Sequence, residues 1–379
     1  MTIQDIYNQS KHKFLFNESE SFLNLREEII NNFDLSLKEK KNNESLKHLD
    51  LSVLNFSYKY KTLEKKIFCS EHEENKININ VSNGIITNVK KRNSDINFSF
   101  NNIDNSNIYA ENKFIDLQKE FDKDYIVNLN SLMLNSGYEI NIGENQEMNI
   151  FISNSVSEEN LTIFQKNIFN CSKNSKINII EECFFDKKAN NNIVNIINLE
   201  DGADLNHIIF QKNDLNTNLQ STSYANCKKN SKYKKIILNI SKSSVRNHHY
   251  ANLIGENSSA SLDGVFFASK NQVVDNKTHI NHRVPNCVSS QRYKGILTDQ
   301  AKASYLSKTF VNKVAQKTEA YQLSKGILLS DNSYFHSKPE LRIFADDVKC
   351  SHGSTIGPID RDLLFYLRSR GLNKKESIS

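Results

Sequence analysis

The first part of the chain carries a helical pattern of apolar and polar positions. In the segment SFLNLREEIINNF, apolar side chains return every three or four residues, as Leu25 and Ile29 do, and Glu27 and Glu28 fall on the opposite face. A spacing near 3.6 residues is typical of an amphipathic helix. The pattern predicts a helical region over residues 1–66.

From residue 67 onward the pattern changes to short runs in which apolar and polar residues alternate. Examples are KININVSNGIITNV, DINFSF, YEINIGENQEMNIFIS and KINIIEECFF. Alternation with a period of two predicts β-strands that bury one face. Such runs follow one another without intervening helices, which favours a mainly β chain built as a solenoid core over residues 67–357, with a pair of β-sandwiches as the alternative.

The turns between these runs hold small or polar residues, as in DGADLNHIIF and NSSASLDGVFFA, but their spacing defines no strict period. The chain contains only 11 Gly and 3 Pro. Asparagine is the next residue that tolerates a left-handed backbone conformation. We therefore expect asparagines at the left-handed turn positions.

A short helix is expected again in the last segment, residues 358–379. Asp360 is placed to cap DRDLLFYLRSR, Arg368 suits the negative end of the helix dipole, and Gly371 lies where a glycine commonly ends a helix.

Composition and charge narrow the classes of function. The chain has 379 residues, 38% of them hydrophobic, and its 49 Lys and Arg against 44 Asp and Glu leave a net charge of +5. That charge is diffuse, and the basic run NCKKNSKYKKI is typical of a solvated strand edge, so nucleic acid is not an expected partner. No run approaches the roughly 20 apolar residues that cross a bilayer, and the opening residues lack a signal-peptide pattern, so we expect no membrane partner and a cytoplasmic location. Six cysteines without close spacing do not indicate a disulfide framework.

Few residues offer recognisable chemistry. The motifs GxxxxGK[ST], GxGxxG, HExxH and GxSxG are all absent, so these nucleotide-binding and hydrolase classes have no local signature. The strongest candidates are Cys350 and His352 in DDVKCSHG, which on a strand would face the same side about 7 Å apart, within reach of one soft metal. The alternative is that Cys350 packs as a small hydrophobic residue and His352 caps a turn before Gly353.

Two weaker candidates lie near each other in THINHRVPNC. His279 and His282 are three residues apart, so on a strand they face opposite sides, and His279 more plausibly bonds Asp275 or the backbone. Cys287 follows Pro285 in a loop, where an exposed thiol would gain thiolate character, or would have no role.

Four segments in order carry a resemblance to a known family. They are VVDNKTHINHRVPNCVSSQRYKGIL (273–297), VAQKTEAYQLSKGILLS (314–330), KPELRIFADDVKCSHGSTIG (338–357) and LLFYLRSRGL (363–372). Together they resemble the SufB/SufD family of the SUF system, which assembles iron–sulfur clusters, and DDVKCSHGSTIG is similar to the SufD form. Upstream the likeness weakens, and before residue 200 only the strand texture is compatible.

The resemblance implies a right-handed parallel β-helix between helical N-terminal and C-terminal regions. It also implies a non-catalytic scaffold that pairs with a SufB-like paralogue, binds a SufC-like ABC ATPase and passes a transient iron–sulfur cluster to apo-proteins. In the family a histidine of the CSHG motif is thought to bind the cluster at the subunit interface, which here is His352, with Cys350 beside it. The resemblance leaves open the use of reduced flavin in the complex.

Two further readings stay open at this point. One is a purely structural β-helix subunit that holds SufB and SufC together without binding the cluster. The other is a solenoid enzyme acting on carbohydrate, which would need a carboxylate cluster on one face that the sequence does not concentrate.

The chain departs from the family pattern at two places that matter. It ends soon after Arg370, so we expect part of the SufC-docking surface to be missing. Ala303 and Ser307 stand where the family usually has glycine, and if those positions need positive φ we expect strained or rebuilt turns.

Overall fold

In the computed structural model, the residues described are 24, 26–31, 68–69, 76–90, 97–102, 124–157, 159–185, 187–213, 217–373 and 376–377. Most of the expected N-terminal helical region lies outside these residues. Within it, residues 26–31 are helical, Ile29 and Ile30 are buried, and Glu27 and Glu28 are exposed, as the pattern predicts.

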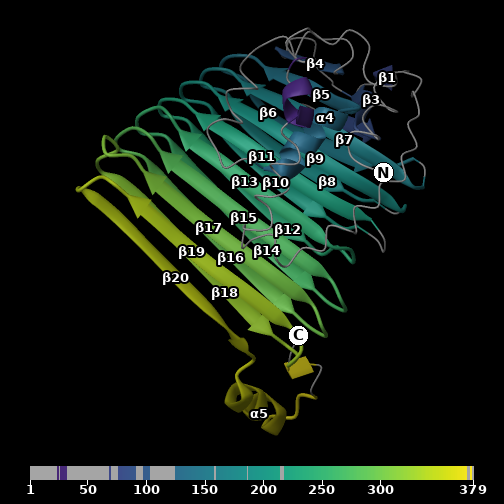
Figure 1. Ribbon diagram of the computed structural model, residues 1–379, viewed down its shortest axis with the longest axis vertical. Helices are drawn as coiled ribbons and strands as arrows, with labels where there is room; N and C mark the ends of the chain where they lie inside the picture. Colours follow the sequence, from purple (N-terminus) through teal and green to yellow (C-terminus); the bar gives the residue numbers. More distant parts are fainter. Residues whose placement is uncertain are drawn as a thin grey trace.

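The strands stack into two facing sheets that form a parallel β-helix of about eight turns (Figure 1). Sheet A contains, in spatial order, β1 (Phe68–Cys69), β3 (Ile85–Lys90), β2 (Lys76–Ser82), β6 (Glu147–Ser155), β8 (Lys176–Cys183), β10 (Asp204–Gln211), β12 (Lys232–Asn239), β14 (Ser259–Ala268), β16 (Val288–Leu297), β18 (Thr318–Leu328) and β20 (Val348–Pro358). Sheet B contains, in spatial order, β19 (Tyr334–Ile343), β17 (Lys302–Val311), β15 (Val273–His282), β13 (Val245–Leu253), β11 (Asn218–Cys227), β9 (Ala189–Leu199), β7 (Leu161–Cys171), β5 (Ser136–Ile142) and β4 (Phe98–Asn102). The expected β-helix is confirmed and the sandwich alternative is wrong.

Alternation along each strand builds the core between the sheets. Along β6, Met148, Ile150 and Ile152 point inward and are buried, while Glu147 and Asn149 are exposed. The same inward positions of successive strands stack on one another and form a large apolar cluster from β2 to Cys287, and a separate cluster around Tyr293 and Tyr305 follows toward the C-terminal end. The turn length explains why the sequence shows no strict period, because stacked side chains lie 26 residues apart in one pair of turns and 28 or 29 in others.

Asparagine occupies most of the left-handed corners, as expected, whereas Lys270, Asp299 and Lys317 occupy such corners in later turns. Asn145, Asn174, Asn230, Asn257 and Asn286 all have φ between 57° and 62°. Four of them donate their backbone N–H to a carbonyl of the next turn, at 2.9–3.0 Å. The corner thus repeats because the left-handed residue aims its N–H along the stack.

Asparagine side chains also bond from turn to turn. Asn178 donates to Asn149 at 3.0 Å and Asn206 donates to Asn178 at 3.1 Å on the outside of sheet A. A second ladder runs through Asn170 and Asn198 on sheet B. Stacked amides satisfy one another because each carries both a donor and an acceptor.

The N-terminal end of the solenoid departs from parallel pairing. The strands β2 and β3 form an antiparallel hairpin through Asn83 and Gly84, both with positive φ, which a two-residue hairpin turn requires. At the same end of sheet B, β4 pairs antiparallel with β5. These strands close the N-terminal end of both sheets.

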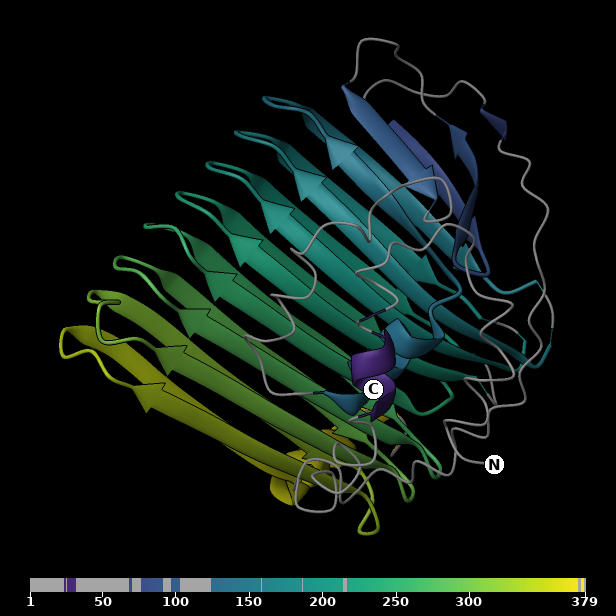
Figure 2. The same cartoon turned by 45° about the horizontal axis from the view of Figure 1, so that its top comes forward.

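The helix α4 (Tyr125–Met133) interrupts the region that the sequence pattern assigns to strands alone. Asp124 caps it by accepting a hydrogen bond from the backbone of Ile126, and the helix packs on the outer face of β7 and β9. The amide of Asn130 donates to the carbonyls of Gln165 and Asn192, which fixes the helix on the sheet. Figure 2 shows α4 and the purple helical turn lying across one face of the stack.

The helix α5 (Arg361–Ser369) follows β20 and extends away from the sheets (Figure 1). Asp360 caps it by accepting from the backbone N–H of Asp362, and Gly371, with φ 97°, ends it, as predicted. Phe365 and Tyr366 are exposed on this helix. No helix in the described part of the chain is long and apolar enough to cross a bilayer.

Candidate functional site

Cys350 and His352 lie on β20, the last strand of sheet A. This strand pairs on one side only, with β18, where Cys350 stands opposite Ala320 and His352 opposite Gln322. Ala320 and Gln322 are buried and face the interior, so Cys350 and His352 face the interior side of the final turn. The prediction that both residues share one face of a strand is confirmed.

The strand bounds correct one detail of the sequence interpretation. The turn expected before Gly353 is absent, because β20 begins at Val348 and continues to Pro358. His352 therefore lies in the middle of a strand.

Cys350 is half-buried against Val311, Ala315 and Ala345. Burial raises the pKa of its thiol, although the backbone N–H of Ala320 partly offsets this effect. The packing agrees with the small-hydrophobe interpretation of this residue. A metal that binds Cys350 must displace the thiol proton, so the affinity of such a metal would rise with pH.

His352 is exposed because no further turn covers it among the described residues. Beneath it, the amide of Gln322 donates to Thr309 at 2.9 Å and to the carbonyl of Glu340 at 3.2 Å, and it accepts from Ser307 at 3.2 Å. A rigid polar floor thus lies under the imidazole.

One turn further in, Gln291 repeats this arrangement. Its amide also donates to Thr309, at 2.8 Å. Sequence reasoning missed this polar column, although QRYKGIL and QLSKGIL carry a visible signal, with Gln291 and Gln322 at the same place in each.

Cys350 and His352 are too few to hold a metal or cluster by themselves. In the described ranges, no three His, Cys, Asp or Glu residues are grouped closely enough to bind a metal ion. Iron in clusters is usually held by four ligands, mostly thiolates with occasional imidazole. The two donors fit an iron–sulfur cluster only if another chain supplies the remaining ligands.

The weaker candidates are buried structural residues. Cys287 is fully buried beside Ser258, and burial raises its pKa, so the exposed-thiolate alternative is wrong. His282 faces the interior and bonds Ser289 at 2.8 Å, while His279 faces outward against Tyr250. The two histidines face opposite sides, as expected.

Asp275 is the centre of an unexpected buried network on sheet B. Its carboxylate accepts from the Nε2 of His248 at 2.7 Å and from Ser304, rather than from His279. Arg246 donates to the Nδ1 of His248 at 2.7 Å and to Asp124 at 2.5 Å. The network ties the N-terminal end of α4 to three strands.

A second buried group lies inside the solenoid. Glu181 accepts from His207 at 2.8 Å, and Lys235 lies one turn beyond with its Nζ atom lacking a hydrogen-bond partner. Burial lowers the pKa of Lys235 to about 8, and the nearby charges of Glu181 and Cys183 oppose the change. The run NCKKNSKYKKI is therefore not wholly a solvated edge, because Tyr233 and Lys235 point inward.

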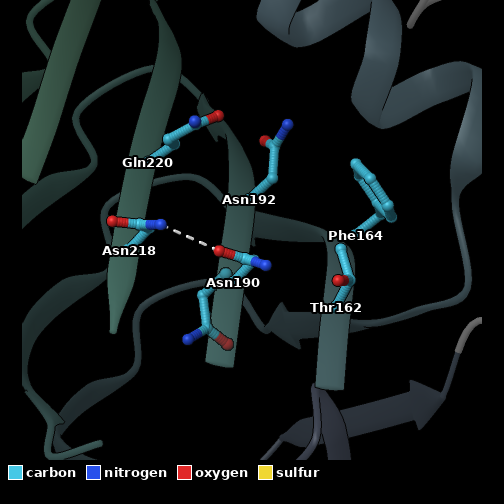
Figure 3. A pocket seen from close by; sticks show the side chains of 7 residues that line it. Thr162, Phe164, Asn190, Asn192, Asn218 and Gln220 are labelled. Carbon is cyan, nitrogen blue, oxygen red and sulfur yellow. Dashed lines mark hydrogen bonds between the residues drawn. The ribbon is translucent and has the colours of Figure 1, made fainter. Parts of the chain in front are cut away.

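A small, shallow hollow lies elsewhere, on the outer face of sheet B (Figure 3). Its walls come from β7, β9 and β11, and Asn218 donates to Asn190 across it at 2.9 Å. The walls hold no titratable side chain. The hollow offers no acid, base or nucleophile, so β20 remains the candidate site.

Comparison with known proteins places the chain among iron–sulfur assembly proteins. Residues 151–379 match the family model described as SUF system FeS cluster assembly, SufBD core domain. The chain is 37% identical to the iron–sulfur cluster assembly protein SufD of Escherichia coli over 35% of its length and 31% of the relative's. It is 34% identical to an iron–sulfur cluster assembly SufBD family protein of Synechocystis over 48% of its length and 40% of the relative's. The matched region therefore spans less than half of these two curated relatives.

Proposed function

Because the chain belongs to the SufB/SufD family of SUF-system iron–sulfur cluster assembly proteins, we propose that it is a non-catalytic scaffold subunit. In this proposal it pairs with a SufB-like subunit and holds a nascent cluster at their interface. A SufC-like ATPase supplies the energy, and apo-proteins receive the cluster. The cluster is cargo, and the proposal includes no flavin, for which neither the described residues nor the family match gives support.

The open C-terminal end of the solenoid carries the proposal. Among the described residues, no strand pairs with the outer edge of β19 or of β20, and each of these terminal strands is at least ten residues long. A long free edge is suited to pairing with a strand of another chain. Phe344, between the two strands, is 58% exposed and adds an apolar contact at the same end.

The ligands in this proposal are His352 and Cys350. They face the interior side of the terminal turn, so a partner that stacks on β20 would enclose them between two solenoids. The enclosed cluster would take its remaining ligands from that partner. His352 makes the first contact, because it is exposed and Cys350 must first lose a proton.

The free cysteines support a cytoplasmic setting. All five cysteines whose side chains are described, Cys171, Cys183, Cys227, Cys287 and Cys350, are unpaired. Unpaired thiols in this number are typical of a reducing compartment.

Anaerobic co-purification tests the cluster role. The chain is co-expressed with SufB-like and SufC-like subunits as wild type, His352→Ala, Cys350→Ala and Ser354→Ala, and iron and acid-labile sulfide are measured per complex. Ser354 is the matched control because it is the next inward position on β20. We expect His352→Ala to lose iron and sulfide with the complex intact, and Ser354→Ala to retain both.

The same measurement addresses the purely structural alternative. If His352→Ala and Cys350→Ala both keep wild-type iron and sulfide in an intact complex, the chain holds its partners together without binding the cluster. If the wild-type chain forms no complex with either partner, the scaffold proposal itself is wrong.

A further inference from the structure

An exposed apolar stripe crosses the outer face of sheet A, away from the candidate site. It consists of Phe210, Ile240, Val265, Phe267, Ile296 and Ile327, whose exposed fractions are 37–60%. The strands that carry it lie side by side from β10 to β18 (Figure 1). Two adjacent rows make up the stripe: Phe267, Ile296 and Ile327 pair in register in one, and Phe210 and Val265 align through Leu238 in the other.

Core packing does not account for the stripe. Gly295 and Gly326 point inward, where an added Cβ would lie 2.3 Å from the ring of Phe266 and 2.4 Å from the ring of Phe335. The adjacent isoleucines therefore point outward by strand alternation. A polar side chain would fit these outward positions equally well, and contiguous exposed apolar surface on a folded protein commonly marks an interaction site.

Lysines lie beside the stripe. Lys212 and Lys270 are exposed in the turns that follow β10 and β14. Lys294 and Lys325 are exposed and pair with each other in register on β16 and β18, and they form no ion pair with any described residue. Apolar surface beside exposed positive charge favours an apolar partner with acidic residues on its flank.

The neighbouring carboxylates offset only part of this charge. Asp263 binds Arg292 at 2.6 Å, and Asp299, which accepts from the backbone N–H of Lys270, lies close enough to offset that lysine. Glu182 lies only beside the first position of the stripe, opposite Phe210. Lys294 and Lys325 therefore leave a positive charge beside Ile296 and Ile327.

The spacing of the stripe suits an α-helix that lies across the strands. Neighbouring strands are about 4.8 Å apart and one helical turn rises about 5.4 Å. A helix in this direction places roughly one apolar side chain over each strand and its flanking residues over the lysines. We propose that this face binds an acidic amphipathic helix of a partner protein, independently of the cluster role of His352.

A defined peptide tests the proposal on the full chain. An 18-residue helical peptide (about five turns) with leucines on one face and glutamates on its flanks is labelled and titrated by fluorescence anisotropy. A matched peptide carries lysines in place of the glutamates. We expect saturable binding of the acidic peptide and at least about tenfold weaker binding of the basic one.

Three variants locate the binding. Ile296→Glu should weaken the acidic peptide at least about tenfold, as loss of a central anchor does, and the double variant Lys294→Glu with Lys325→Glu should reverse the charge preference. Val314→Glu, an exposed apolar position 61% exposed in the turn before β18, should leave binding unchanged. Circular dichroism confirms that each variant is folded.

Four outcomes would overturn the proposal. The acidic peptide shows no saturable binding, or both peptides bind alike, or Ile296→Glu binds as the wild type does. In the fourth, Ile296→Glu leaves binding of the acidic peptide unchanged but abolishes one of two other interactions of the wild type. These are a homodimer, detected by sedimentation velocity, and binding to phosphatidylserine vesicles. That result would assign the stripe to a second copy or to a lipid surface.

Discussion

Replacing Lys235 with methionine should stabilise the protein. The lysine is 1% exposed inside the solenoid, and its Nζ atom has no hydrogen-bond partner. Burial disfavours its charged form and lowers its pKa from 10.5 to about 8, although Glu181 and Cys183 attract the charge. Methionine fills a similar volume without an amine to desolvate.

The pKa gives the size and the sign of the effect. The fall of the Lys235 pKa from 10.5 to about 8 means that folding disfavours the charged lysine by roughly 3 kcal/mol. Between about pH 8 and 10.5, Lys235 is protonated in the unfolded chain but neutral in the folded protein, so the free energy of unfolding of the wild type increases as the pH rises. Below pH 8 the lysine is charged in both states, and the folded protein carries the full cost of burying that charge. At pH 7 we therefore expect Lys235→Met to be more stable than the wild type by about 1–3 kcal/mol. The value is below the full cost of the buried charge because the variant also loses the attraction between Lys235 and Glu181.

Urea unfolding followed by far-ultraviolet circular dichroism at several pH values between 7 and 10.5 tests this. The stability difference between Lys235→Met and wild type should shrink as the pH rises through the window. Lys234→Met is the matched control, because Lys234 is exposed on the same strand and should show no such change. A variant less stable than wild type at pH 7, or a difference that stays constant with pH, would refute the reasoning.

Three further predictions concern acid stability, turn geometry and thiol reactivity. Below about pH 4 the wild type should lose more stability than Asp124→Asn in an acid titration. Burial raises the Asp124 pKa, but the charge of Arg246 together with hydrogen bonds to the carboxylate lowers it by more, so its ionised form stabilises the fold above the unfolded pKa of about 3.9 and stops doing so as the pH falls; parallel titration curves would contradict this. Asn230→Ala should cost about 1–2 kcal/mol in urea unfolding and Asn230→Gly much less, because φ is 57°, and equal costs would contradict the turn argument. A thiol reagent should label Cys350 before the four buried cysteines, as peptide mapping would show, and earlier labelling of a buried cysteine would contradict the burial.

Strand alternation is local, which is why the fold class could be predicted from the sequence. Each run such as KINIIEEC shows its buried and exposed faces without reference to any other segment. The same locality predicts that Cys350 and His352 share a face. The asparagines at the corners could be predicted from the scarcity of glycine. Ala303 and Ser307, by contrast, show the limit of comparing the chain with a family pattern one residue at a time. Both lie inside β17 without positive φ, so the expected strain is absent.

Features that depend on pairing between distant turns could not be predicted. Gln322 gains its place under His352 only through a register that joins residues 30 positions apart, and the varying turn length hides that register. Lys235 gives no local sign of being buried, because KYKKI has lysines at both inward and outward positions. The helix α4 was missed because its apolar positions are mixed with asparagines, one of which, Asn130, bonds the backbone of sheet B instead of solvent.

The interior of the solenoid changes character along its length, and this bears on what the open end can do. Many inward side chains of the early turns, such as Ile150 and Ile179, are aliphatic, although Glu181 and His207 form a buried polar pair among them, and the antiparallel strands close that end. The last turn instead presents Cys350, His352 and Ser354 over a floor of hydrogen-bonded amides. An aliphatic last turn would leave a large apolar surface in water whenever no partner is present, whereas polar side chains tolerate both water and a partner. The terminal turn is therefore suited to an interface that forms and separates reversibly, and a cluster held there would be released when the two solenoids part.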